Sequence, residues 1–311
     1  MIRAVPTWLV RALQLGIALA LLALLWRAAD GPTVAKSLAG ADWRFLALAL
    51  VALSVQTILS ALRWRLTAGQ LGMSFEVGHA IREYYLSQVV NQSLPGGMIG
   101  DAGRAYRTRA EAGLLAAGQA VVIERLAGQI AMFLTLAVAF LCTTLVAGGL
   151  DWPRWLAVPL AVFVVAGLAA PLVLWAASGI GGAIGRAIGR LHELLTKTLT
   201  QRDVLPRQVA LSIGTAMCNL AAFAFCARAV GVELSLVAVT ALVPVILFTM
   251  LIPISISGWG LREGAAAALF PLVGASASGG LASSVAFGLT FLVAVLPGVI
   301  LLRLKTEAPA T

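Results

Sequence analysis

Six long apolar runs dominate the sequence, and they limit the folds open to the chain. A helix needs about 20 predominantly apolar residues to cross the hydrocarbon core of a bilayer. The runs lie near residues 8–26, 45–62, 126–147, 155–176, 207–227 and 281–302. Only 11% of the 311 residues are charged, against about 25% in ordinary soluble domains, and the mean hydropathy is +0.97. The sequence therefore predicts an all-α polytopic membrane protein with about six spanning helices.

The charge balance of the chain is basic, with 22 Lys and Arg against 13 Asp and Glu. In a membrane protein this excess indicates topology, because basic side chains concentrate in cytoplasmic loops and attract anionic lipid headgroups. Following the runs in order places most basic residues on the side of both termini. We expect a multi-pass protein of the cell inner membrane with cytoplasmic N- and C-termini, and no nucleic-acid partner.

Two further segments fit no single span. Residues 77–97 are too polar to face lipid, and residues 236–276 are too long for one helix and are interrupted by Pro253, Gly258 and Gly260. We predict that each is a re-entrant pair of broken helices, opening from opposite faces. The halves, about 1–150 and 151–311, would then form an inverted repeat within one integral membrane domain, the arrangement that marks transporter binding sites. The alternative is that both segments are ordinary interhelical loops or spanning helices.

The first tip, "NQSLPGGMIGDAGRAYRTR" at residues 91–109, combines proline, glycines and charges. Proline ends the incoming helix and glycines permit a sharp reversal. The free N–H groups of the returning helix suit a phosphate or carboxylate. We expect Asp101 to cap this helix or to contribute to a ligand site. Arg104 either reaches the membrane interface or grips a phosphate.

Ionisable residues also interrupt the apolar part of the chain. Glu124 and Arg125 lie at the start of a run, where charged groups are expensive and indicate function. Neighbours on a helix point about 100° apart, so each needs its own partner; Glu124 could pair with an arginine such as Arg104 or carry a proton. Arg262 and Glu263 are predicted at the start of the outward half-helix of the second pair.

These patterns define a candidate headgroup path but no catalytic or metal site. The path residues are Asn91, Pro95, Gly96, Gly100, Asp101, Arg104, Glu124, Arg125, Ser257, Gly258, Gly260, Arg262 and Glu263. The sequence has no Walker loop, dinucleotide fingerprint, His/Cys metal cluster or Ser–His–Asp signature, and we expect no cofactor. Residues 181–199 are predicted to form a basic amphipathic helix on an anionic leaflet.

Three motifs carry a resemblance to a known family. "NQSLPGGMIGDAGRAY", "VVIERLAGQ" and "IPISISGWGLREGAAAALF", in this order, resemble the membrane domain of the lysylphosphatidylglycerol synthase family, also described as flippase-like. The resemblance covers nearly the whole chain. It implies matches at Pro95, Gly96, Gly100, Asp101, Arg104, Glu124, Arg125, Gly258, Gly260, Arg262 and Glu263. In full-length synthases this domain moves an aminoacylated phosphatidylglycerol between leaflets and a separate soluble domain makes it; this chain ends at Thr311, so the resemblance implies translocation without synthesis.

The sequence thus favours a non-enzymatic lipid flippase that moves a phospholipid or lipid-linked headgroup through an Arg/Glu-lined groove. Its expected partners are membrane lipids, either anionic phospholipid or polyprenyl-phosphate lipid. Two alternatives remain open: an intramembrane transferase acting on a lipid-linked sugar, and an accessory protein of a separate lipid-modifying enzyme.

Overall fold

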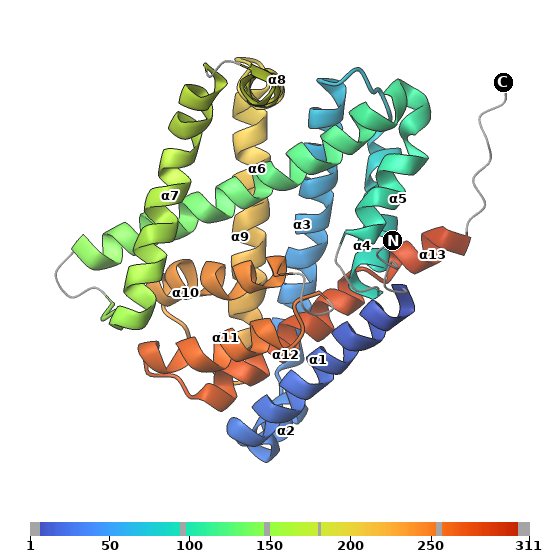
Figure 1. The fold of residues 1–311 in the computed structure, drawn as a ribbon. Coiled ribbons are helices and arrows are strands. Elements are labelled where there is room, and N and C mark those ends of the chain that lie inside the picture. Colours follow the sequence, from blue (N-terminus) through green and yellow to red (C-terminus); the bar gives the residue numbers. More distant parts are fainter. Residues whose placement is uncertain (1–6, 94–97, 146–149, 180–181, 253–256, 304–311) are drawn as a thin grey trace.

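The chain folds into packed helices, and the computed structural model describes residues 7–93, 98–145, 150–179, 182–252 and 257–303, among which there is no β-strand (Figure 1). The α-helices are α1 (Thr7–Ala28), α2 (Gly31–Ala39), α3 (Trp43–Gly69), α4 (Val77–Ser93), α5 (Ile99–Arg107), α6 (Arg109–Leu145), α7 (Arg154–Ser178), α8 (Gly182–Leu199), α9 (Leu205–Ala229), α10 (Leu236–Phe248), α11 (Leu261–Leu269), α12 (Ala277–Ala294) and α13 (Pro297–Arg303). Two 3₁₀ turns, η1 (Thr249–Leu251) and η2 (Phe270–Val273), extend α10 and α11. The predicted all-α fold is confirmed.

Among the described residues, five helical segments are long and apolar enough to span a membrane. They are α3, α6, α7, α9 and the segment Ala277–Leu301, which joins α12 and α13. The remaining predicted run, 8–26, lies in α1, and it counts toward a sixth span only together with α2, across a bend of 96°. Asp30 takes a left-handed conformation at this bend, with φ 55°, and Pro32 stands in the first turn of α2, where its fixed φ is tolerated.

The first predicted re-entrant pair consists of α4 and α5. The turn before α4 and the turn after α5 lie at the same end of the molecule, so the two helices enter and return (Figure 1). Gly100 lets them approach closely, because a Cβ there would lie 2.0 Å from the carbonyl oxygen of Ser87. Pro95 and Gly96 lie outside the described residues. The chain therefore folds back at this tip, as the polar sequence predicted.

The second pair consists of α10 with η1, and α11 with η2. Gly258 and Gly260 have φ of 80° and 89°, a conformation that glycine adopts without steric cost, and they turn the chain into α11. Pro253 lies outside the described residues. The hydroxyl of Ser257 donates a hydrogen bond of 2.9 Å to the carbonyl oxygen of Asn91. The two tips therefore meet inside the molecule.

The helices around the first re-entrant pair and those around the second pack in corresponding ways. The amide of Asp42, at the start of α3, donates to the carbonyl of Ala229, at the end of α9, over 2.9 Å, so these adjacent helices are antiparallel. Each helix is followed by a turn of the same kind, in which a glycine has a positive φ. This glycine is Gly72 after α3 and Gly231 after α9, and both have φ 83°. Helix α6 packs on α10, and α13 packs on α4. This supports an inverted arrangement, while the exact halves, 1–150 and 151–311, stay a prediction.

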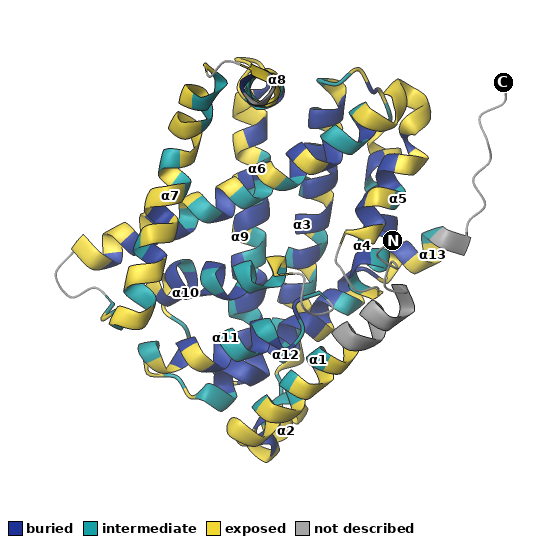
Figure 2. Ribbon diagram, viewed as in Figure 1, coloured by how far each residue is buried: buried dark blue, intermediate teal, exposed yellow. Residues whose placement is uncertain are grey.

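The interior of the fold lies along α3, α9, α11 and α12, whereas α7 is mostly exposed (Figure 2). Apart from Arg154 at its first position, its exposed side chains are apolar, which suits a helix that faces lipid. Helix α8 is seen end-on in Figure 1 and lies across the ends of α7 and α9. The predicted amphipathic helix thus forms and runs perpendicular to the spanning helices.

Candidate functional site

The candidate site begins with polar stripes on otherwise apolar helices. On α3, the side chains of Gln56, Ser60, Arg63 and Thr67 are all buried, and their spacing of four, three and four residues places them on one helix face. On α4, Ser87 and Asn91 are buried in the same way. Burying polar groups is unfavourable unless they find partners. These stripes therefore point to a shared polar interior.

Asp101 is the acceptor at the centre of the first tip. Its carboxylate accepts hydrogen bonds from Ser87 at 2.9 Å and Asn91 at 3.1 Å. It also forms ion pairs with Arg104 at 3.0 Å and with Arg125. The prediction that Asp101 caps α5 is wrong, because the N-cap position is Met98 and has no side-chain cap. The Oδ1 of Asn91 takes that role, accepting from the amide of Gly100 at 2.8 Å.

The carboxylate of Glu124 accepts hydrogen bonds from a second group of donors. Its Oε1 lies 2.6 Å from Nη2 of Arg63 and 3.3 Å from the hydroxyl of Tyr84. Its Oε2 lies 3.4 Å from Nη2 of Arg104. The expected Glu124–Arg104 contact is therefore confirmed, as are separate partners for Glu124 and Arg125.

Arg104 bridges the two carboxylates and is wholly buried, with 0% of its surface exposed. Its guanidinium lies 4.5 Å from the ring centre of Trp64 and 4.5 Å from that of Tyr84. Cation–π contacts of this kind are strongest where water is excluded. The aromatic clamp fixes Arg104 between Asp101 and Glu124.

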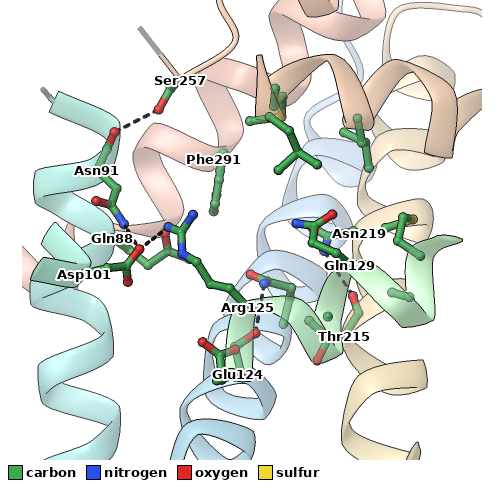
Figure 3. Close-up of a pocket in the computed structure, with 18 of the residues that line it drawn as sticks. Gln88, Asn91, Asp101, Glu124, Arg125, Gln129, Thr215, Asn219, Ser257 and Phe291 are labelled. Atoms are coloured by element: carbon green, nitrogen blue, oxygen red, sulfur yellow. Dashed lines mark hydrogen bonds and ion pairs between the residues drawn. The ribbon is translucent and has the colours of Figure 1, made fainter. Parts of the chain in front are cut away.

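A cavity of about 230 Å³ opens beside this network. Arg125 reaches from α6 across the cavity to Asp101, next to Phe291 of α12 (Figure 3). The wall includes Gln88 of α4, Gln129 of α6, and Thr215 and Asn219 of α9. It also includes the five predicted path residues Asn91, Asp101, Glu124, Arg125 and Ser257. Both halves of the chain thus contribute polar side chains to one cavity.

Arg262 and Glu263 form a separate ion pair at the start of α11. Nη2 of Arg262 lies 2.6 Å from Oε1 of Glu263, and the hydroxyl of Ser284 bonds to both side chains. The other carboxylate oxygen of Glu263 accepts from the amide of Gly260 at 2.6 Å, which caps the helix. Neither charged residue lines the cavity. The structure therefore places these two predicted residues apart from the first network.

Arg63 belongs to this network but is absent from the predicted headgroup path, because the charge pattern counted it only among the basic residues on the side of the termini. Arg63 is 3% exposed and pairs with Glu124. The signal was present in the polar stripe of α3, and a similar stripe runs along α9 through Gln208, Ser212, Thr215 and Asn219. Polar residues at helical spacing within an apolar run indicate a buried polar face.

The chemistry of the site is electrostatic. Arg63, Arg104 and Arg125 face two carboxylates, Asp101 and Glu124, so the ionised network holds three positive and two negative charges, an excess of one positive charge. Within the described part of the chain there is no group of three His, Cys, Asp or Glu residues that could hold a metal ion. The arrangement suits an anionic group better than a cation.

The fold and this site define a class: a multi-pass, all-α membrane protein whose two re-entrant tips meet beside a buried ionic network. The chain matches the family described as the lysylphosphatidylglycerol synthase TM region over residues 11–298. The protein belongs to this family, whose name associates it with lipid modification. No curated protein matches the chain.

Proposed function

We propose that the protein translocates a phospholipid or a lipid-linked headgroup between the two leaflets of the membrane. The headgroup passes through the polar cavity while the acyl chains stay in lipid. The observation that carries this proposal is that a buried network with an excess positive charge lines a cavity where the two re-entrant tips meet.

The wall of the cavity contains two arginines that suit an anionic headgroup. Nη1 of Arg63, a residue that lines the cavity, has no hydrogen-bond partner among the described residues. The side chain of Arg125 is 35% exposed, so a ligand can reach it. An arginine offers a planar fork of donors that matches a phosphate. A headgroup phosphate would therefore reach Arg125 directly, and the buried Nη1 of Arg63 only after a small rearrangement of the cavity wall, without breaking the buried pairs of Arg104.

The physical need for such a path is clear from the cost of the alternative. Moving an unpaired charge into hydrocarbon is strongly unfavourable. Glutamine, asparagine and threonine side chains in the cavity wall replace water around the polar headgroup, and the arginines neutralise its charge. The network thus lowers the barrier without a covalent step, which supports a translocator and not an enzyme.

We propose that the end of the molecule with α8 faces the cytoplasm of an inner membrane, with both termini on that side. Arg186, Arg190 and Lys197 on α8 are exposed, and cytoplasmic segments are enriched in such residues. A cysteine introduced at Arg186 should react with a membrane-impermeant maleimide in inverted vesicles and stay unlabelled in intact cells. Labelling in intact cells would reverse the proposed orientation.

The translocation proposal is tested with purified protein in liposomes that contain short-chain fluorescent lipids with several headgroups. Dithionite quenches the probe in the outer leaflet, so the protected fraction reports movement between leaflets. We expect the wild-type protein to lower the protected fraction with a clear headgroup preference. We expect Arg125→Ala to slow this movement at least about tenfold, which corresponds to about 1.4 kcal/mol of lost interaction with the moving headgroup.

The matched control is Arg228→Ala. Arg228 is 56% exposed and pairs with Glu233 at 3.3 Å at the molecular surface, so its loss removes the same charge away from the cavity. Arg228→Ala should translocate at the wild-type rate. Protection equal to that of protein-free liposomes for every headgroup, with and without a pH gradient, would overturn the proposal.

A further inference from the structure

A second concave site lies between α6 and α8, away from the polar cavity. It has a volume of about 680 Å³ and is almost entirely apolar. Its lining on α6 is Leu114, Leu115, Gly118, Gln119, Val122, Ile123 and Leu126, and its lining on α8 is Leu191, Leu194 and Leu195. We call this the α6–α8 groove. A hollow of this size and lining is unfavourable for water, because apolar walls offer it no hydrogen bonds.

Helix α8 carries two stripes, and only one of them faces the groove. Leu191, Leu194 and Leu195 line it. Arg186, Arg190 and Lys197 follow one another at spacings of four and seven residues, which places them on one face of the helix. All three are exposed. Arg190 precedes Leu194 by four residues, so the basic stripe borders the leucine stripe on the surface of α8.

The orientation of α8 indicates where the groove and the basic stripe lie in the membrane. The helix lies perpendicular to the spanning helices at one end of the molecule (Figure 1). Amphipathic helices with a basic face lie in this way at the boundary between headgroups and acyl chains. The basic stripe is then at the level of the headgroups, and the groove extends from it along α6, a spanning helix.

We propose that the α6–α8 groove is a binding site for an anionic phospholipid. One acyl chain fills the groove, and the headgroup phosphate lies beside Arg190, with Arg186 and Lys197 adding to the positive charge of the same helix face. Charge complementarity selects the anionic headgroup, and the leucines bind the chain. No residue of this groove lines the polar cavity, so the site does not depend on the proposed translocation.

The glycine at position 118 allows a direct test. A Cβ at Gly118 would meet no heavy atom within 4 Å, so Gly118→Trp should place an indole in the groove without disturbing the packing of α6. Gly69 is likewise open, with nothing within 4 Å of a Cβ, and it lies at the end of α3, outside the groove. Gly69→Trp is therefore the matched control.

The experiment uses the full chain in nanodiscs that contain a trace of phosphatidylglycerol with a photoactivatable group on its acyl chain. After illumination, labelled peptides are identified by mass spectrometry. We expect labelling of residues 114–126 and of α8, with Gly118→Trp reducing it at least about fivefold and Gly69→Trp leaving it unchanged. Replacing Arg186, Arg190 and Lys197 together by Gln should reduce labelling about tenfold or more, because each basic group contributes to attraction of an anionic lipid.

A phosphatidylcholine probe with the same chain gives the decisive comparison. Weaker labelling of the groove by this probe supports the anionic site. Equal labelling by both probes, unaffected by the Gln substitutions, would mean that ordinary surrounding lipid occupies the groove and would overturn the proposal. Loss of labelling in Gly69→Trp as well would also contradict it. None of these readouts requires transport, so failure here leaves the translocation proposal standing.

Discussion

Two buried arginine clusters in the described part of the chain are built on corresponding helices but differ in how fully their guanidinium groups are paired. In the second, every guanidinium nitrogen of Arg262 has a contact, to Glu263, to Ser284 or to the sulfur of Met250. In the first, Nε and Nη1 of Arg104 and Nη1 of Arg63 lack hydrogen-bond partners in the described chain. In the second cluster every guanidinium nitrogen has a contact, while the first borders a cavity and contains buried guanidinium nitrogens without hydrogen-bond partners among the described residues.

The two clusters have similar surroundings, namely aromatic rings beside the arginine and a glycine on the next helix. The difference in the pairing of their guanidinium groups therefore has a local cause. Arg104 lies against Trp64 and Tyr84, and Arg262 lies 5.2 Å from Trp259 and 5.3 Å from Phe287. A glycine on the following helix faces each cluster, since a Cβ at Gly128 would come within 2.7 Å of Arg63. At Gly288 the distance to Arg262 would be 2.4 Å.

What differs is the residue one turn before each glycine. On α6 it is Glu124, which binds two arginines, and on α12 it is Ser284, which supports an ion pair between neighbours. The same framework therefore holds an open network in one half and a closed pair in the other. We infer that the first serves the headgroup and the second serves the fold.

The largest expected effect is on the closed pair. Glu263→Ala should lower the free energy of unfolding by about 3–5 kcal/mol, because it leaves Arg262 buried without its carboxylate and removes the cap of α11. Thermal unfolding of the detergent-solubilised protein, followed by tryptophan fluorescence, measures this. Glu233→Ala, at an exposed pair, is the control and should cost less than about 1 kcal/mol. Equal small effects would show that the closed pair does not hold the fold.

Glu124→Gln is expected to be milder for stability and severe for transport. The amide oxygen still accepts from Arg63, and Asp101 still pairs with Arg104, so a loss of about 1.5–3 kcal/mol follows from weaker hydrogen bonds to charged groups. The extra positive charge should trap an anionic headgroup and slow its release. Dithionite assays at matched amounts of folded protein test this, and an unchanged rate would contradict the role given to the open network.

Ser284→Ala tests the closed pair of Arg262 and Glu263 without breaking it. It removes hydrogen bonds to Arg262 and Glu263 but leaves their ion pair, so the free energy of unfolding should fall by about 1–1.5 kcal/mol. Translocation per folded molecule should not change. A selective loss of transport in this variant would place the second cluster on the path.

The smallest effect is expected at the contact between the tips. Ser257→Ala removes one hydrogen bond, to the carbonyl of Asn91, and should cost about 0.5–1 kcal/mol. Hydrogen exchange of the amides around Asn91 measures the loosening directly. If exchange at that tip is the same in both proteins, the hydrogen bond does not hold the tips together.

The membrane fold was largely predictable because its signals are local. Runs of apolar residues defined the spans, and Gly258 and Gly260 marked a turn whose positive φ the structure confirms. The bend between α1 and α2 was not predicted, because the apolar run itself is continuous and the turn depends on the left-handed Asp30. Length and hydropathy report spans but not such breaks.

The site was predictable only where the sequence was unusual. Asp101, Glu124 and Arg125 stood out as charges near the tip or within an apolar run, and they do converge on one cavity. Arg63 did not stand out, because it lies next to the end of its span, where arginines commonly set topology. Its pairing with Glu124, 61 residues later, depends on how α3 packs on α6, which no local pattern encodes.

The most direct test of the account compares Arg125→Ala with Ser284→Ala in the same liposome assay. Both change one polar side chain, one in the open network and one in the closed pair. We predict that Arg125→Ala loses headgroup-dependent translocation while unfolding at nearly the wild-type temperature, and that Ser284→Ala translocates normally despite a lower unfolding temperature. Normal translocation by Arg125→Ala, or loss of translocation by folded Ser284→Ala, would contradict it.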